Sequence, residues 1–187
     1  KNSGKQDQYA AAFGGLNNFI FKKGNRVLIQ PLNMRDHNLG KFFSNLILLW
    51  TGVTRNSSKI VKDYKFKTTR TTHNIEEIKK FVEPFKKNLE QSKLNFNKIS
   101  SLIEDSWQLK KNISTKISNK KMEKFSSKLH KIGVNGHRII GAGGGGFFLC
   151  VANPTKQKML SKIFPKTIKI KIKYEPLGSR PVSILYN

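Results

Sequence analysis

Apolar and polar residues in the first third of the chain follow patterns typical of a helix, a hairpin and a buried strand. The stretch SGKQDQYAAAFGG has an alanine run and a terminal glycine, which predicts a short helix with Ser3 as its N-cap and Gly14 as its end. In NNFIFKKGNRVLIQPL, apolar residues flank residues 23–25, which predicts a β-hairpin. The apolar run NLILLWTG predicts a buried strand that ends at Gly52.

The pattern changes to helical spacing after residue 56. Residues 56–58 are suited to cap a helix that starts near Lys59. Three further helical patterns follow, because apolar residues recur every three or four positions, with an interruption at Pro84 in the first of them. The residues that define these patterns are Ile75, Ile78, Phe81, Val82, Phe85 and Leu89, then Phe96, Ile99, Ile103 and Trp107, and finally Met122, Phe125 and Leu129 before a stop at Gly133.

The C-terminal part returns to patterns typical of strands. HRII and FFLCVA, joined by a glycine-rich loop, predict a strand pair, and Asn153 with Pro154 predicts the start of a helix that runs to Lys162. In TIKIKIKY, isoleucines alternate with lysines, which predicts a last strand. The order strand, strand, helix, strand, with helices from the middle of the chain as a cover, indicates an α+β fold with a mostly antiparallel sheet.

The composition supports a globular protein with a substantial core. Of 187 residues, 37% are hydrophobic and 13 are Phe, which suffices for one large domain or two small ones. There is no apolar run long enough to span a membrane and no sequence typical of a secretory signal. A single cysteine, Cys150, excludes an internal disulfide framework, so we expect a cytoplasmic protein. Because the chain begins with Lys1, we interpret it as the back part of a longer protein.

The formal net charge of +25 raises nucleic acid as a partner, because clustered cations gain affinity by releasing counterions from phosphates. Six of the 36 basic residues are Arg, the side chain that recognises bases and phosphates in a bidentate way. The lysines are spread through every segment, and the chain has neither an RNA-binding aromatic signature nor a Cys/His zinc pattern. We interpret the charge as a solvated Lys-rich surface and expect no specific nucleic-acid partner and no membrane partner.

The histidines and the cysteine show no spacing typical of metal ligands or of a nucleophile with its base. The residues considered are His37, His73, His130, His137 and Cys150. We interpret the histidines as surface or structural residues and expect no metal site in this chain.

The stretch GAGGGGFF, residues 141–148, has five glycines in its first six positions and then enters an apolar run. Successive glycine N–H groups can point into one concavity that binds phosphate, and the same residues can equally form a tight connection between strands. Neither the Rossmann fingerprint nor the Walker pattern is present, because no Lys followed by Ser or Thr succeeds the glycines.

Several motifs occur in a fixed order between residues 4 and 180. They are GKQDQYAAAFGGLNNFIF, LILLWTGVTRNSSKIV, SWQLKKNIS, RIIGAGGGGFFLC and EPLGSR. Together they resemble the later two-thirds of a sugar kinase of the GHMP superfamily, the group of galactokinase, homoserine kinase, mevalonate kinase and phosphomevalonate kinase. Within this superfamily, the sequence most resembles the D-glycero-D-manno-heptose 7-phosphate kinase branch.

The resemblance implies a fold in two parts and an activity. Residues 1–55 correspond to the C-terminal portion of an N-terminal α/β domain, and residues 56–187 to a ferredoxin-like C-terminal domain. ATP, with Mg²⁺, is implied to donate a phosphoryl group to an alcohol group, here the anomeric hydroxyl of D-glycero-D-manno-heptose 7-phosphate. The alternatives are a GHMP kinase for another sugar, such as fucose or a uronic acid, and a basic nucleic-acid-binding or inactive scaffold protein.

The resemblance also implies roles for individual residues. An Asp in the segment matching GKQDQ approaches the acceptor hydroxyl in galactokinase-like and mevalonate kinase-like relatives, which corresponds to Asp7. Without the neighbouring motifs, Asp7 would be a first-turn acid stabilised by the helix dipole. Here Arg138 replaces the usual Lys of the third family motif, and Ile140 stands where many mevalonate kinases have Thr. The loop residues of that motif correspond to Gly141, Ala142, Gly143, Gly144, Gly145 and Gly146.

Phosphoryl transfer depends on positioning and on charge stabilisation, so an Asp can orient the hydroxyl while loop amides and cations hold phosphate oxygens. Four more side chains are candidate substrate contacts. Trp107 and Lys110 share a helix face, although Trp107 can equally be a core residue and Lys110 a solvated end. Arg55 and Arg180 follow tight turns and carry planar donors that suit a sugar phosphate.

One family element does not occur in the chain. The ATP-phosphate loop of the form P-x-G-x-G-L-G-S-S is not found in the 187 residues. We therefore assign the ATP loop and the metal ligands to residues outside this chain, and we expect the chain alone to have no kinase turnover.

We predict that any binding of DNA or RNA is weak and independent of sequence, because scattered lysines act only as a diffuse cationic surface. Fluorescence polarisation with a defined and a random oligonucleotide should give equal affinities that fall steeply as salt rises. Nanomolar affinity with a sequence preference at physiological salt would contradict this prediction.

Overall fold

The computed structural model describes residues 5–54, 60 and 68–181. Most of the predicted elements are present within these ranges. In chain order they are α1 (Gln6–Phe13), β1 (Asn17–Phe21), β2 (Val27–Pro31), α2 (Asp36–Ser44), β3 (Leu46–Trp50), α4 (Thr69–Lys80), α5 (Val82–Glu90), α6 (Phe96–Lys111), α7 (Lys120–Lys131), β4 (His137–Ile139), β5 (Phe147–Val151), α8 (Pro154–Ile163) and β6 (Lys169–Lys171).

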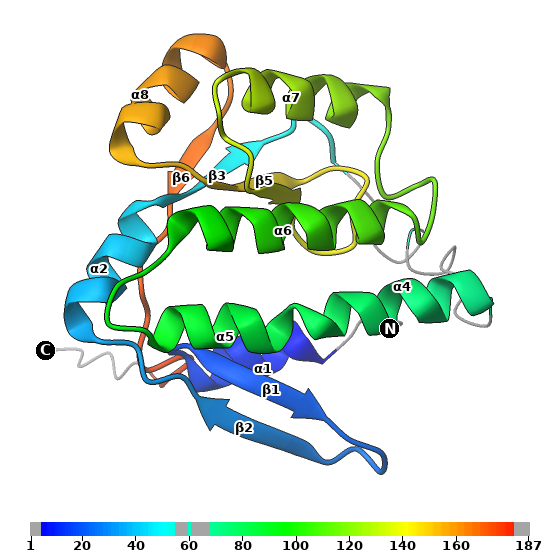
Figure 1. Cartoon of the computed structure of the whole chain (residues 1–187), viewed down its shortest axis with the longest axis vertical. Coiled ribbons are helices and arrows are strands. Elements are labelled where there is room, and N and C mark those ends of the chain that lie inside the picture. Colours follow the sequence, from blue (N-terminus) through cyan, green and yellow to red (C-terminus); the bar gives the residue numbers. More distant parts are fainter. Residues whose placement is uncertain (1–4, 55–59, 61–67, 182–187) are drawn as a thin grey trace, which may run out of the picture.

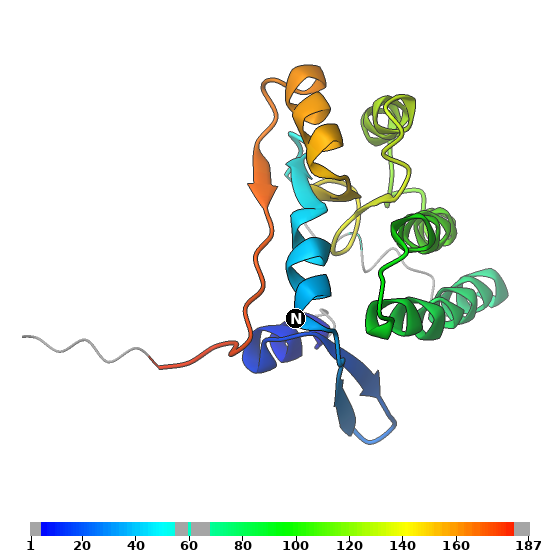
Figure 2. The ribbon, with the colours of Figure 1, turned by 60° about the vertical axis from the view of Figure 1, so that its left-hand side comes forward.

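The main sheet has four strands in the order β4-β5-β3-β6, and each neighbouring pair is antiparallel. From β3 onward the elements follow one another as strand, helices, strand, strand, helix and strand. In the sheet, the first of these strands, β3, lies between the third, β5, and the fourth, β6. This order is that of a ferredoxin-like unit. Figures 1 and 2 show α6 and α7 on one face of this sheet. The predicted α+β class is confirmed.

The segment before β3 forms a smaller unit. β1 and β2 pair as the predicted hairpin, with Phe19 opposite Ile29, and α1 lies beside it at one end of the molecule (Figure 1). The strand pairing of β3 affects the expected domain boundary, because Leu48 pairs with both Leu149 of β5 and Ile170 of β6. A division between residues 55 and 56 would separate β3 from its own sheet. We therefore propose a boundary ahead of β3, near α2.

Local signals explain where the helices begin and end. The Asn153 side chain accepts a hydrogen bond from the Lys156 amide and Pro154 is the first residue of α8, as predicted. The helix interrupted near Pro84 divides into α4 and α5 at Phe81. The first helix ends at Gly14 but begins after Lys5, which makes no side-chain cap. Ser3 and the predicted helix start at residues 56–59 lie outside the described residues.

The core lies between the sheet and its helices. Leu49, Phe148 and Trp107 are almost fully buried together in one cluster. Cys150 of β5 belongs to the same cluster, and burial raises the pKa of its thiol, which agrees with its predicted place in a core strand. A second cluster joins α2, α5 and α6 and includes Phe42.

The last strand is shorter and more exposed than the alternating pattern suggested. β6 contains three residues, and Ile168 and Ile170 are 59% and 42% exposed. Among the described residues β6 pairs with β3 alone, so Ile170 and the preceding Ile168 lie at an edge of the four-stranded sheet. Ile172 packs partly against the second core cluster.

Among the described residues, no helix is both long and apolar enough to cross a membrane.

Candidate functional site

Helix α6 contacts β4, β5 and the glycine-rich loop between them. The Arg138 guanidinium donates a hydrogen bond to the Ser106 hydroxyl at 3.0 Å. The Trp107 ring packs edge-on against Phe148, with ring centroids 6.5 Å apart. The Lys110 ammonium donates to the carbonyl of Gly141. The motifs SWQLKK and RIIGAGGGGFFLC, which are distant in sequence, therefore form one packed unit.

Close packing accounts for the glycines of this loop. Gly144 has φ +73°, and a Cβ there would lie 2.6 Å from the Ile60 side chain and 2.9 Å from the Lys116 carbonyl. A Cβ on Gly145 would lie 2.7 Å from the Val53 carbonyl. The glycines are thus required for close backbone approach, whatever the loop binds.

The amides of the loop have partners inside the protein at two positions. The Gly144 N–H donates to the Ile117 carbonyl at 2.6 Å, and the Gly146 N–H donates to the Val53 carbonyl at 2.9 Å. These two amides are not available to a phosphate in this conformation. Of the two interpretations of the glycine stretch, the tight strand connection explains these contacts.

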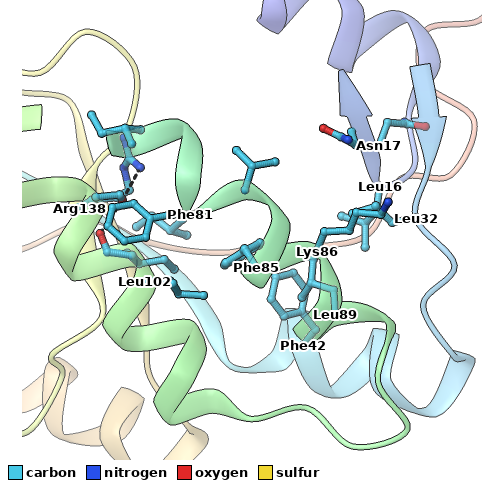
Figure 3. A pocket seen from close by; sticks show the side chains of 16 residues that line it. Leu16, Asn17, Leu32, Phe42, Phe81, Phe85, Lys86, Leu89, Leu102 and Arg138 are labelled. Carbon is cyan, nitrogen blue, oxygen red and sulfur yellow. Dashed lines mark hydrogen bonds between the residues drawn. The ribbon is translucent and has the colours of Figure 1, made fainter. Parts of the chain in front are cut away.

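A cavity of about 410 Å³ lies between the hairpin segment and the ferredoxin-like unit, a size typical of ligand pockets. Its walls are mostly apolar, and none of the described residues that line it is Asp or Glu. Figure 3 shows Arg138 at one end, beside Phe81 and Leu102, with Leu16 and Asn17 at the other. Burial lowers the pKa of Arg138 below its ordinary value. Among the described residues, the Arg138 guanidinium has the Ser106 hydroxyl as its hydrogen-bond partner.

The first and the last described segments of the chain meet at α1. The Gly15 N–H donates to the Glu175 carbonyl at 2.7 Å, and the Ser179 N–H donates to the Ala11 carbonyl at 2.8 Å. A Cβ on Gly14 would lie 2.2 Å from the Gly178 nitrogen. The motifs AAAFGG and EPLGSR are thus held together through their backbones. The residue after Gly15 is Leu16, which lines the cavity.

The structure separates the candidate site residues into groups. Arg138 lines the cavity beside Ser106 of α6, whereas Lys110 contacts Gly141 further along the same helix, and neither Lys110 nor residues 141–146 line the cavity. Asp7 is exposed in the first turn of α1 and does not line the cavity. Figures 1 and 2 both place α1 away from the loop that joins β4 and β5. Arg180 is exposed and follows Ser179, which contacts α1.

Two other candidates have different outcomes. Trp107 is 1% exposed and belongs to the core, so in this structure it offers no surface to a substrate. Of the two interpretations that the sequence left open for Trp107, a core residue or a substrate contact, its burial favours the core residue. Arg55 lies outside the described residues.

Comparison with known proteins identifies a related group. No family model matches the chain. Over 165 residues it is 30% identical to the D-glycero-alpha-D-manno-heptose 7-phosphate kinase of Campylobacter jejuni, a match that covers 87% of the chain and 48% of that enzyme. A crystal structure of a protein from Campylobacter jejuni described as a sugar kinase superposes with a TM-score of 0.66 and 26% identity, covering 94% of this chain and 50% of that one.

By sequence and by fold, the chain resembles the C-terminal part of a GHMP-family sugar kinase. A D-glycero-D-manno-heptose 1-phosphate kinase from Bacteroides thetaiotaomicron has the same fold, with a TM-score of 0.63 and 19% identity over 97% of this chain and 50% of its own. The chain thus spans about half the length of the relatives that it matches. The predicted resemblance to GHMP kinases is confirmed.

The described residues around the glycine loop provide few groups that could hold a nucleoside triphosphate. The groups in contact with the loop include apolar side chains, backbone carbonyls, the Lys110 ammonium, and the hydroxyl and amide of Thr51, which both donate to the Gly146 carbonyl. A triphosphate with Mg²⁺ requires several free amides or cations and an acidic metal ligand. The described residues of this loop do not fit that group by themselves.

Sequence reasoning missed a cluster on the far side of α6. Glu104, His130 and His137 come together there, although their spacing follows no ligand pattern. The sequence argument rested on the spacing of the histidines relative to Cys150, which is buried in the core. Only the packing of α6, α7 and β4 could have indicated this arrangement.

We predict that Gly144→Ala lowers the free energy of unfolding by about 2 kcal/mol, because a side chain there is strained by the positive φ and meets the Lys116 carbonyl. The matched control is Gly40→Ala in α2, where an added Cβ has nothing within 4 Å. That variant should be neutral or stabilised by about 0.5–1 kcal/mol, because Ala favours a helix over Gly. Chemical denaturation measures both. Equal stabilities for the two variants would show that the loop is not tightly packed.

Proposed function

We propose that this chain is part of an ATP-dependent kinase that phosphorylates the anomeric hydroxyl of D-glycero-D-manno-heptose 7-phosphate. The observation that carries the proposal is the 30% identity over 165 residues to a heptose 7-phosphate kinase. Three of the motifs contribute residues to the wall of one cavity, through Leu16, Ser106 and Arg138, which supports a binding site between the hairpin segment and the ferredoxin-like unit.

Arg138 is the proposed contact for a phosphate oxygen of the substrate. Its guanidinium has a hydroxyl partner and no carboxylate partner among the described residues, and it lies in a mostly apolar wall. A buried cation without a counter-charge is unfavourable, and an anion that enters the cavity supplies that charge. A planar guanidinium suits phosphate because it can donate two parallel hydrogen bonds.

Asp7 is the proposed group that orients the acceptor hydroxyl and takes its proton. Its carboxylate lies in the first turn of α1, and the backbone contacts of Gly15 and Ser179 hold this helix in place. Asp7 and Arg138 belong to the two parts of the chain that meet at the cavity. In this proposal, the segment with α1 and the ferredoxin-like unit close on the bound substrate, so that Asp7 and Arg138 both contact it, as occurs in many kinases.

ATP with Mg²⁺ is the phosphoryl donor in this proposal. When bound, it supplies the phosphoryl group, and the metal neutralises charge that develops during transfer. Because the described loop residues do not fit a triphosphate by themselves, we assign no transfer step to them. Their proposed part is to hold Arg138 and α6 at the cavity wall.

We predict that Asp7→Asn lowers turnover by about 100-fold or more with little change in sugar affinity, because shape is kept and the proton acceptor is lost. Turnover of the full-length protein is measured with ATP and heptose 7-phosphate, and with fucose for comparison. Asp36→Asn is the matched control, since Asp36 lies in the first turn of α2 as Asp7 does in α1.

Wild-type turnover in a folded Asp7→Asn variant would reduce Asp7 to a helix-start acid. Turnover on fucose but not on heptose 7-phosphate would overturn the substrate while keeping the kinase.

We predict that Arg138→Met raises the KM for heptose 7-phosphate about 10-fold or more, the range for a lost charge-assisted hydrogen bond. Arg26→Met makes the same chemical change on the exposed hairpin and should leave KM unchanged. Circular dichroism checks that both variants fold. An unchanged KM in folded Arg138→Met would remove Arg138 from the substrate site.

A further inference from the structure

Three side chains from separate elements converge beside α6. Glu104 comes from α6, His130 from the last turn of α7 and His137 from β4. One ligand atom from each lies within 4.8 Å of the other two. The His130 Nε2 is 3.6 Å from one Glu104 oxygen, and the His137 Nδ1 is 4.0 Å from the other.

The Glu104 carboxylate has an unsatisfied atom. Its Oε2 is buried and has no hydrogen-bond partner among the described groups, while the side chain as a whole is 17% exposed. Buried polar atoms in folded proteins nearly always have a partner, and an unpaired carboxylate oxygen is costly. A bound cation would satisfy this oxygen.

The partners of His130 and Glu104 orient them for binding. The Gln108 amide donates to Glu104 Oε1 at 2.5 Å. The His130 Nδ1 lies 3.3 Å from Asn135 Oδ1, which can only accept, so in the neutral tautomer with the proton on Nδ1 the lone pair of Nε2 is directed toward Glu104. Metal-ligating histidines are commonly held in this way through their second nitrogen.

His137 requires a proton shift and a turn of its ring to join them. Its Nδ1 donates to the Val134 carbonyl at 2.8 Å, and its Nε2 lies 2.6 Å from the Ser126 hydroxyl. When the proton moves from Nδ1 to Nε2, Nε2 can donate to Ser126, and the ring must turn so that the Nδ1 lone pair points away from the Val134 carbonyl and toward Glu104. The Val134 carbonyl loses its donor in exchange, and no net proton is released.

We propose that Glu104, His130 and His137 bind a divalent cation of the Zn²⁺ class, which ties α6, α7 and β4 together. Two imidazoles and a carboxylate are a ligand set that Zn²⁺ accepts. Metal–ligand bonds of about 2.0–2.1 Å place tetrahedral ligand atoms about 3.3 Å apart. The separations of 3.6 and 4.0 Å between the histidine nitrogens and Glu104 must therefore shorten, and His137 must leave the Val134 carbonyl, when the metal binds. The His130 side chain is 41% exposed, which leaves the fourth position to water. The site is separate from the cavity of the proposed kinase.

The test uses the full-length protein, prepared without a histidine tag and stripped with a chelator. Zn²⁺ alone is titrated by calorimetry, and Co²⁺ is used for its visible absorption in a tetrahedral site. One equivalent should bind, and Zn²⁺ should raise the unfolding temperature. His130→Ala removes an exposed ligand without opening the core, and Glu104→Gln removes the charge. Each should weaken binding by at least about 10- to 100-fold, the range for lost support of a metal ligand.

His73→Ala is the matched control, because it removes an exposed histidine far from the cluster in sequence and should leave Zn²⁺ affinity unchanged. The alternative is an ion pair between Glu104 and protonated His130, which needs no metal. The absence of stoichiometric Zn²⁺ binding, or equal affinity in folded His130→Ala and wild type, would overturn the metal site in favour of that ion pair. Neither result depends on kinase activity, so the proposed function is tested separately.

Discussion

The pairing of β3 with two neighbours is the constraint on which the rest of the structure depends. β3 lies between β5 and β6, so both of its edges are hydrogen-bonded. Leu49 is fully buried in the core cluster that contains Trp107 of α6, and Leu46 is buried in the second cluster. Without β3, β6 would lose its recorded strand partner and β5 one of its two, and α6 would lose part of the surface against which it packs.

Close backbone approach is the second feature that organises the molecule. Gly136 precedes β4 where α6 passes, and a Cβ there would lie 2.4 Å from the Ser100 Cα. Gly144 and Gly145 let the next loop contact residues near 53 and 117, and Gly14 with Gly178 joins the two ends of the described chain. Glycine is required at each place because backbone occupies the position of a side chain. The glycine motifs of this fold therefore have a structural role in addition to any role in binding.

The two faces of α6 have different chemical properties. Ser106 faces Arg138 and the mostly apolar cavity, where a guanidinium without a carboxylate partner among the described residues favours an anion. Glu104, two residues earlier, faces the histidines of α7 and β4, where an unpaired carboxylate oxygen favours a cation. One rigid helix thus positions a proposed phosphate contact and a proposed metal ligand. Changes at one site need not affect the other, since they lie on different sides of the helix.

Local patterns in the sequence determined the helices, the hairpin, the strand pair and the α+β class, because capping residues, turn glycines and apolar spacing act over a few positions. They also determined the family resemblance. Only the tertiary structure decided that β3 pairs with β5 and β6, that Trp107 is a core residue and that Glu104 meets two histidines. These features depend on contacts between residues far apart in the chain, such as Leu48 with Ile170 and Glu104 with His137. Residue spacing carries no signal for such contacts, because they arise only when separate elements pack together.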